Sequence, residues 1–210
     1  MPREQLYFAG VSEIVGGTDV ALIILADKSR TRQLSIVCDR STAVQIELRV
    51  KAVPITTIML PEVLSRLLRM DKTAEYEISI DGINEGQYIM RLMNTVTGRS
   101  DQLRASDAIL LSVVADIPLY IDSSLLSRQS VPFNPTHNGI SIPINSLSEE
   151  MLNKALEQAI KDENYEMASY VRDEINRRKK KWRKLDIFMC LMRPANKNFR
   201  KTKPLMPYVY

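Results

Sequence analysis

The stretch "LRASDAILLSVVADIPLYI", residues 103–121, decides the fold class. Polar residues at its start lead into an apolar run that is too short for a membrane span and is typical of a buried helix. We expect this helix to begin at about Ser106 and to end before Pro118. The following "PLYID" has the composition of a short strand. The stretch therefore predicts a helix packed against a sheet.

Strand patterns surround this helix. Two apolar runs, residues 5–15 and 19–27, flank the turn sequence "GGT" and predict a β-hairpin, and "RQLSIVCD" adds another strand. Residues 74–81 and 86–94 alternate between apolar and polar side chains, which predicts two more strands, the first with one wet face. Adjacent hairpins of this kind are more typical of a mixed or antiparallel sheet than of a doubly wound parallel one.

Two shorter segments have helical spacing. In "STAVQIELRV" the apolar residues Ala43, Ile46 and Val50 share one helical face, and Ser41 or Thr42 can serve as the N-cap. "PEVLSRLLRM" begins with a proline, which suits the first turn of a helix. We therefore expect an α+β fold with packed helices, followed by a C-terminal helical hairpin.

Composition divides the chain into four parts. Residues 1–128 form the expected α+β domain, and residues 129–147, rich in proline and asparagine, read as a linker. Residues 148–180 predict the helical hairpin, because "KDEN" interrupts the phase of two apolar stripes. Residues 181–210 are basic with scattered apolar residues, and we expect them to be disordered unless a partner binds.

Charge is unevenly distributed. From Arg177 to the end there are twelve basic residues and one acidic residue, whereas the rest of the chain carries 17 of the 29 basic and 24 of the 25 acidic residues. A polyanion is therefore expected to be drawn to the C-terminal part and not to the bulk of the domain.

Compartment signals are few. The N-terminal sequence lacks the apolar core of a signal peptide, and no stretch reaches the length of a membrane span. Cys38 and Cys190 have no partner at metal-ligand spacing and are expected to be free thiols. These features favour a cytoplasmic protein without a membrane contact.

Two stretches resemble known families. Residues 21–125 are similar to the bifunctional nuclease domain, a bacterial and plant family linked with DNase and RNase activity. The similarity lies in "LSIVCDRSTAVQIEL", "VPITTIMLPEVLSRLL", "GQYIMRL" and, above all, "LRASDAILLSVVADIPLYI". Residues 149–179 resemble the UVR motif, a helical hairpin of nucleotide-excision-repair subunits, in "ENYEMASYVRDEI". The first resemblance implies cleavage of DNA or RNA, and the second implies docking to a protein partner, with a second copy of the chain as one option.

The chain also departs from the family pattern. The family usually has proline, glycine, glutamate and a His-Asp pair near the positions held here by Ala105, Asp39, Thr42, Thr57 and Ile58. Two functions therefore stay open. One is a metal-assisted nuclease of low sequence specificity. The other is a weakly active or inactive adaptor that acts through protein contacts in DNA repair or a stress response.

Arg104, Ser106 and Asp107 are the candidate catalytic residues. A helix start offers backbone N–H groups to a phosphate, which Arg104 would clamp. Asp107 would hold Mg²⁺ or Mn²⁺ or orient the attacking water, and Ser106 would orient both partners. A purely structural interpretation is that Ser106 caps the helix, Asp107 favours its positive end and Arg104 pairs with Asp107.

Other polar residues give weaker signals. Phosphodiester hydrolysis commonly uses several carboxylates around a cation, and further candidates are Glu75, Glu77, Asp81 and Asp101. The alternative for these four is a solvated sheet face. Asp39 follows a strand and is better explained as a helix cap. His137, the single histidine, lies in the linker and is expected to be a solvated loop residue, so a histidine-dependent mechanism is not expected.

The C-terminal part supplies two candidate surfaces. Seven of eight residues in "RRKKKWRK" are basic, which predicts a salt-sensitive nucleic-acid contact in which Trp182 stacks on a base, through Arg177, Arg178, Lys179, Lys180, Lys181, Trp182, Arg183 and Lys184. The alternative is a solubilising helix end. The hairpin offers a partner-binding face formed by Tyr165, Glu166, Arg172 and Asp173, although these charges can also pair within the hairpin.

Overall fold

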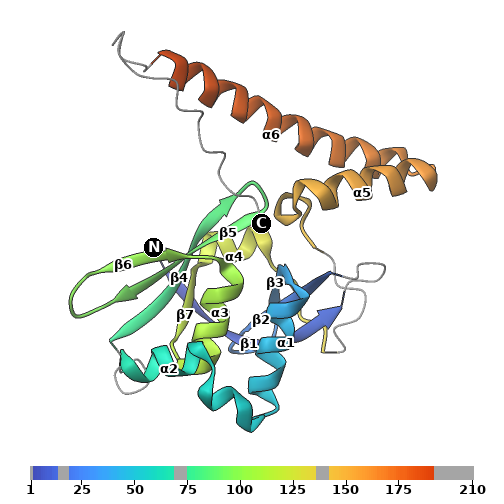
Figure 1. Ribbon diagram of the computed structural model, residues 1–210. Helices are drawn as coiled ribbons and strands as arrows, with labels where there is room; N and C mark the ends of the chain where they lie inside the picture. Colours follow the sequence, from blue (N-terminus) through green and yellow to red (C-terminus); the bar gives the residue numbers. More distant parts are fainter. Residues whose placement is uncertain (1, 14–18, 69–74, 136–141, 192–210) are drawn as a thin grey trace.

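The computed structural model describes residues 2–13, 19–68, 75–135 and 142–191, with only the backbone given for residues 13 and 181–191. A mixed eight-stranded sheet and packed helices form its body, and a pair of helices follows (Figure 1). The α+β prediction is therefore confirmed.

The elements alternate irregularly along the chain, as expected. The strands are β1 (Arg3–Glu13), β2 (Val20–Asp27), β3 (Arg32–Asp39), β4 (Tyr76–Asn84), β5 (Gln87–Asn94), β6 (Ser100–Leu103), β7 (Leu119–Asp122) and β8 (Val131–Pro132). The helices are α1 (Arg40–Val50), α2 (Leu60–Leu67), α3 (Ala105–Ala115), α4 (Ser123–Gln129), α5 (Glu149–Lys161) and α6 (Tyr165–Leu191), with 3-10 turns η1 (Pro54–Ile58) and η2 (Ile144–Ser146).

The sheet consists of two antiparallel meanders joined by one strand. Its order is β6-β5-β4-β7-β1-β2-β3-β8, and the β1–β2 hairpin is present as predicted. β7 pairs antiparallel with β1 and parallel with β4, which is the one parallel pairing between the strands described. The short strand predicted from "PLYID" therefore lies in the middle of the sheet.

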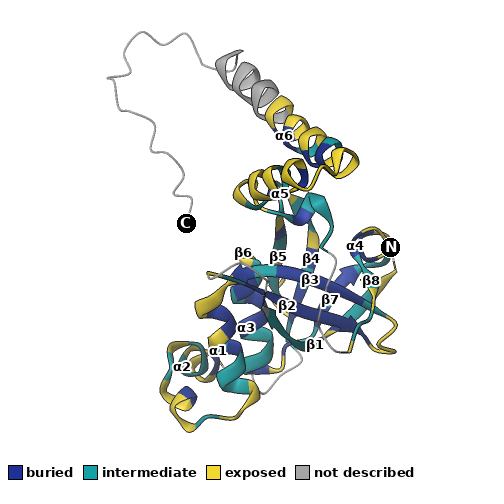
Figure 2. Ribbon diagram, turned by 90° about the vertical axis from the view of Figure 1, so that its right-hand side faces the viewer, coloured by how far each residue is buried: buried dark blue, intermediate teal, exposed yellow. Residues whose placement is uncertain are grey.

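Helix α3 crosses the sheet and forms the centre of the core. Its residues Ala108, Ile109 and Leu110 are buried, and it packs against β3, β5, α1 and α2. β2 is buried on both faces, as its uninterrupted apolar run "ALIILA" requires. Figures 1 and 2 show α1, α2 and α3 grouped at one end of the molecule and the α5–α6 pair at the other.

Helix α1 begins differently from the prediction. Its N-cap is Asp39, not Ser41 or Thr42, because the Asp39 carboxylate accepts a hydrogen bond from the Thr42 backbone N–H at 2.7 Å. Ala43 and Ile46 are buried as expected, whereas Val50 at the end of the helix is exposed. The role preferred for Asp39 from the sequence, helix capping, is therefore confirmed.

The C-terminal helices form the predicted hairpin, with different limits. Helix α6 continues to Leu191, past the boundary set at residue 180, because no proline or glycine interrupts the chain there. The expected linker is partly ordered, since β8 pairs with β3 and the Asn134 backbone N–H donates to Gln33 at 2.8 Å. His137 lies outside the described residues.

Asp27 closes the turn between β2 and β3. It is 7% exposed, and its carboxylate accepts hydrogen bonds from the backbone N–H groups of Thr31 and Arg32 at 2.7 and 3.0 Å and from the Ser29 hydroxyl at 2.9 Å. Burial alone would raise the pKa of Asp27, but a hydrogen bond from the Thr31 hydroxyl, followed by those from Arg32, Ser29 and the Thr31 backbone, outweighs it and lowers the pKa to about 2.

We expect Asp27→Asn to lower the free energy of unfolding at pH 7 by about 2 kcal/mol. A carboxylate with a depressed pKa stabilises the fold above its unfolded value near 3.8, and this contribution is lost as the pH falls towards 2. Denaturant titrations between pH 7 and pH 2 should therefore show the two proteins converging in acid. Asp101→Asn, on the exposed edge strand β6, is the control and should change little. A gap that stays constant with pH would contradict the prediction.

Candidate active site at the start of helix α3

Arg104 and Asp107 form a two-pronged ion pair at the surface. The Nε of Arg104 donates to one carboxylate oxygen of Asp107 at 2.7 Å, and its Nη2 donates to the other at 3.0 Å. The side chains are 68% and 42% exposed. The pairing expected from a purely structural interpretation is confirmed, and solvent can reach both groups.

The helix start differs from the expectation at Ser106. The N-cap of α3 is Arg104, whose backbone is still extended after β6, and no side chain caps the helix. Ser106 therefore lies inside the first turn, where it is buried, so the prediction that it caps the helix is wrong. Asp107 lies in the first turn, where its negative charge is favourable.

Asp39 lies close enough to this pair to act on it electrostatically, although 65 positions separate it from Arg104. Asp107 first, through a hydrogen bond and its charge, and then the charge of Asp39 raise the pKa of Arg104. Burial would raise the pKa of Asp39 itself, but hydrogen bonds from Ser41 and Thr42 lower it. Asp107 thus bonds the guanidinium directly, whereas Asp39 acts on it through its charge alone.

The other candidate carboxylates do not join this cluster. Glu77 is buried and accepts a 2.7 Å bond from Arg3, so it does not lie on a solvated face. Glu75 precedes β4. Asp81 pairs with Arg91 at 2.8 Å, and Asp101 lies on β6. In the described part of the chain no three His, Cys, Asp or Glu side chains are grouped as metal ligands.

Cys38 is buried beside the start of α1 and is a free thiol, as predicted. Burial first, and then the charge of Asp39, raise the pKa of Cys38 to about 12. Such a thiol stays protonated at neutral pH and is a poor nucleophile. The side chain of Cys190 lies outside the described residues.

The basic stretch of α6 is not a uniform surface. Lys179 and Lys180 are exposed, and Arg177 is exposed while pairing with Glu174 at 2.7 Å. Arg178 instead points inward with 8% exposure, which removes it from the candidate nucleic-acid surface. The side chains of Lys181, Trp182, Arg183 and Lys184 lie outside the described residues.

Arg178 fastens the helical pair to the rest of the chain. Its guanidinium donates to the backbone carbonyls of Leu147 at 2.8 Å and Asn145 at 3.1 Å, and to Glu174 at 2.8 Å. The turn between β4 and β5 lies directly against this contact, with Gly86 beside Leu147. In a run of basic residues, only the Glu174 four positions earlier could have signalled a buried arginine.

The predicted partner-binding face of the hairpin is solvent-exposed. Tyr165, Glu166, Arg172 and Asp173 all lie at the surface of α6. Tyr170, which the sequence analysis missed, is 60% exposed, and Tyr165 is 70% exposed. Exposed tyrosines among charges are typical of protein interfaces, whereas the buried residues Leu152, Val171 and Ile175 hold the pair together.

Comparison with known families explains this arrangement. The model of the bifunctional nuclease domain matches residues 23–134, just over half of the chain, including Asp39 and all of α3. The chain belongs to the bifunctional nuclease domain family. The match covers the strands β3 to β8 and the last five residues of β2, whereas β1 lies outside it. The Arg104–Asp107 pair therefore lies within the part of the chain that defines the family.

A second family match covers the helical pair. The UvrB/uvrC motif matches residues 144–181 and so contains both sides of the Arg178 contact. No curated protein matched the chain significantly. Among the described helices, none combines the length and the apolar character that crossing a bilayer requires.

Proposed function

We propose that this chain cleaves phosphodiester bonds in DNA or RNA with low sequence specificity, at the Arg104–Asp107 pair. The observation that carries the proposal is the exposed two-pronged pair at the uncapped start of α3, on which the charge of Asp39 also acts. Carboxylates next to an arginine are what phosphodiester hydrolysis needs, because one group stabilises phosphate charge while another handles water.

Arg104 acts on the phosphate in this proposal. Its guanidinium matches two phosphate oxygens as well as it matches the Asp107 carboxylate. An incoming phosphate competes with Asp107 for Arg104 and also meets the N–H groups at the start of α3. The exchange is energetically easy, since an exposed ion pair is worth at most about 1 kcal/mol. Asp107 is then released beside the bound phosphate, where it can orient a water molecule. Buried Ser106 supports this turn of the helix.

A divalent cation, Mg²⁺ or Mn²⁺, is part of the proposal. Such cations are often held by one or two carboxylates together with substrate phosphate oxygens, and the exposed Asp107 supplies one such carboxylate. Asp107 would hold the cation once Arg104 has moved to the phosphate. When bound, the cation would neutralise phosphate charge and lower the pKa of a water molecule.

Supercoiled plasmid DNA and total RNA, incubated with the purified protein in Mg²⁺, Mn²⁺ or EDTA, test the proposal. We expect cleavage with a cation, none in EDTA, and none by the Asp107→Ala variant. Equal cleavage by both proteins would indicate a contaminating nuclease and overturn the site. Absence of cleavage under every condition would favour the adaptor function. That function is also compatible with the Arg104–Asp107 ion pair and with the exposed tyrosines Tyr165 and Tyr170 of the hairpin.

Lys179 and Lys180 are proposed as non-specific nucleic-acid contacts, together with Arg177 and the basic residues 181–184. We expect the double variant Lys179→Ala/Lys180→Ala to bind a single-stranded oligonucleotide more weakly, with a salt slope reduced by about 1.4, because each lost phosphate contact removes about 0.7. Fluorescence anisotropy at several salt concentrations measures the slope. An unchanged slope would remove these lysines from the interface. The Lys154→Ala variant on α5 controls for loss of surface charge.

The hairpin is proposed to dock on a second hairpin of the same kind. Its exposed face carries Tyr165 and Tyr170 together with both signs of charge, from Glu166, Arg172 and Asp173, so two copies can be complementary. We expect sedimentation velocity to show a concentration-dependent dimer that Tyr165→Ser/Tyr170→Ser abolishes. A monomer at all concentrations would exclude self-association.

A further inference from the structure

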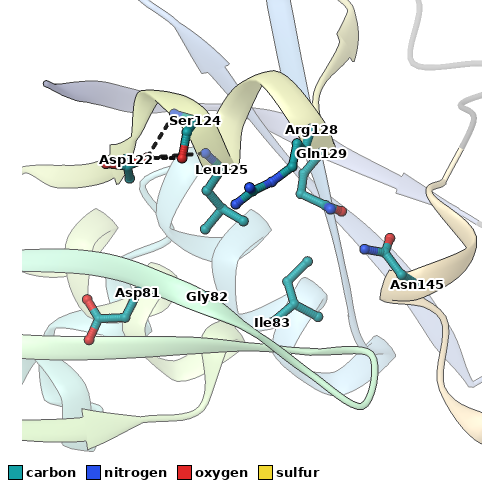
Figure 3. Close-up of a pocket in the computed structure, with 9 residues that line it drawn as sticks. All are labelled: Asp81, Gly82, Ile83, Asp122, Ser124, Leu125, Arg128, Gln129 and Asn145. Atoms are coloured by element: carbon teal, nitrogen blue, oxygen red, sulfur yellow. Dashed lines mark hydrogen bonds between the residues drawn. The ribbon is translucent and has the colours of Figure 1, made fainter. Parts of the chain in front are cut away.

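A pocket of about 490 Å³ has a lining that includes neither Arg104 nor Asp107 (Figure 3). It opens where β4, the start and end of α4, and the turn η2 meet. The lining residues are Asp81, Gly82, Ile83, Asp122, Ser124, Leu125, Arg128, Gln129 and Asn145. Its volume falls within the range of pockets that bind small molecules.

Three polar side chains of the pocket have hydrogen-bonding groups that no other described residue satisfies. Gln129 is 94% buried, and its Oε1 accepts no hydrogen bond from any described group. Arg128 and Asn145 likewise make no side-chain hydrogen bond or ion pair within the described part of the chain. In Figure 3 the Gln129 amide points towards Asn145, and the Arg128 guanidinium extends over the space above Ile83. An unsatisfied buried amide costs about 1–3 kcal/mol, which a bound ligand would recover.

The carboxylates of the pocket are already engaged. Asp81 accepts bonds from Ser79 at 2.7 Å and from Arg91 at 2.9 Å. Asp122 caps α4 and accepts from the Ser124 backbone N–H at 2.8 Å. The unused groups are therefore one guanidinium and two carboxamides, beside the apolar side chains of Ile83 and Leu125.

We propose that this pocket binds a nucleoside monophosphate. A carboxamide presents a donor and an acceptor side by side, which matches the edge of a nucleobase and especially that of adenine. A guanidinium provides the matching group for a phosphate. Gln129 and Asn145 read the base, Arg128 holds the phosphate, and Ile83 and Leu125 contact the apolar faces of base and sugar. Rotation of the Gln129 amide lets either of its ends meet the base.

The site also connects the two family motifs. Asn145 lies within the UvrB/uvrC motif, and its carbonyl accepts the Arg178 hydrogen bond that fastens α6. The remaining pocket residues up to Gln129 belong to the bifunctional nuclease domain. A bound nucleotide therefore contacts the segment that positions the helical pair.

Isothermal titration of the full chain with AMP, in EDTA, tests the proposal. We expect a Kd below about 1 mM and a roughly tenfold weaker Kd for Arg128→Ala and for Gln129→Leu, since each loses a polar contact to the ligand. Gln129→Leu removes no existing bond of Oε1, and thermal unfolding checks that it folds. Arg128 is exposed, so Arg128→Ala gives the answer if Gln129→Leu does not fold.

The controls separate this site from the proposed nuclease site. Arg99→Ala, an exposed arginine outside the pocket, should bind AMP like the unaltered protein. Loss of AMP binding in Arg104→Ala would place the nucleotide at the Arg104–Asp107 pair and overturn the proposal. No AMP binding up to 10 mM, about ten times the expected limit, overturns the proposal. The proposal is also overturned if Arg128→Ala and Gln129→Leu bind AMP as tightly as the unaltered protein. Inorganic phosphate binding as tightly as AMP would reduce the pocket to an anion site and also overturn it. None of these results depends on whether the chain cleaves nucleic acid.

Discussion

Replacing Arg104 with alanine is expected to lower the rate of nucleic-acid cleavage by about 10²- to 10³-fold, the usual effect of removing one group that stabilises transition-state charge. The protein should remain folded, because the side chain is 68% exposed and its pair with Asp107 is worth at most about 1 kcal/mol. Loss of activity without loss of stability would identify Arg104 as a catalytic group rather than a structural one.

Two further variants sharpen this experiment. Arg104→Lys keeps the positive charge but loses the two-pronged geometry, so it should recover part of the rate. Arg99→Ala removes a comparable exposed charge elsewhere and should cleave at the normal rate. Initial rates on a labelled oligonucleotide, together with thermal unfolding of each protein, give both quantities. Full activity of Arg104→Ala would move the active site away from α3.

Replacing Gly86 with alanine is expected to destabilise the junction between the sheet and the helical pair by about 2.5–4 kcal/mol. Gly86 has φ of +85°, where a side chain adds strain of about 1 kcal/mol. A Cβ at this position would also overlap the Leu147 carbonyl and approach Arg178 Nη1 at 3.2 Å. Moving that carbonyl weakens a hydrogen bond to a charged group, which is worth about 1.5–3 kcal/mol.

Gly98 provides the matched control for this substitution. It also has a positive φ, of +69°, but a Cβ there would meet nothing within 4 Å. Gly98→Ala should therefore cost only about 1 kcal/mol, the backbone strain alone. Hydrogen exchange of α5 and α6, measured beside thermal unfolding, locates the effect. Equal losses in the two variants would show that the Leu147 contact contributes nothing to stability.

Local patterns predicted most of the elements. Alternation in residues 74–81 and 86–94 gave β4 and β5, the interruption at "KDEN" gave the α5–α6 pair, and the polar start of 103–121 gave α3. These predictions succeeded because each pattern depends on neighbouring residues. The Arg104–Asp107 pair could be predicted for the same reason, since side chains separated by three positions on a helix lie next to each other.

Contacts between segments that are distant in the sequence could not be predicted from local patterns. Glu77 has the alternation of a wet face, yet Arg3, which is 74 positions earlier, pairs with it and allows its burial. Asp39 comes near Arg104 only because α1 and α3 pack together. The pocket at Gln129 needs three separate segments to meet. Sequence periodicity carries no information about such long-range contacts.

The central place of β7 has a consequence for the order of folding. The β1–β2–β3 and β4–β5–β6 meanders each consist of neighbours in the chain, so both can form early from contacts of short sequence separation. They can join only through residues 119–122, which pair with Arg3–Leu6 on one side and Ile78–Ile80 on the other. During synthesis, the two half-sheets therefore keep unpaired edge strands until β7, at the end of the stretch 103–121, has been made.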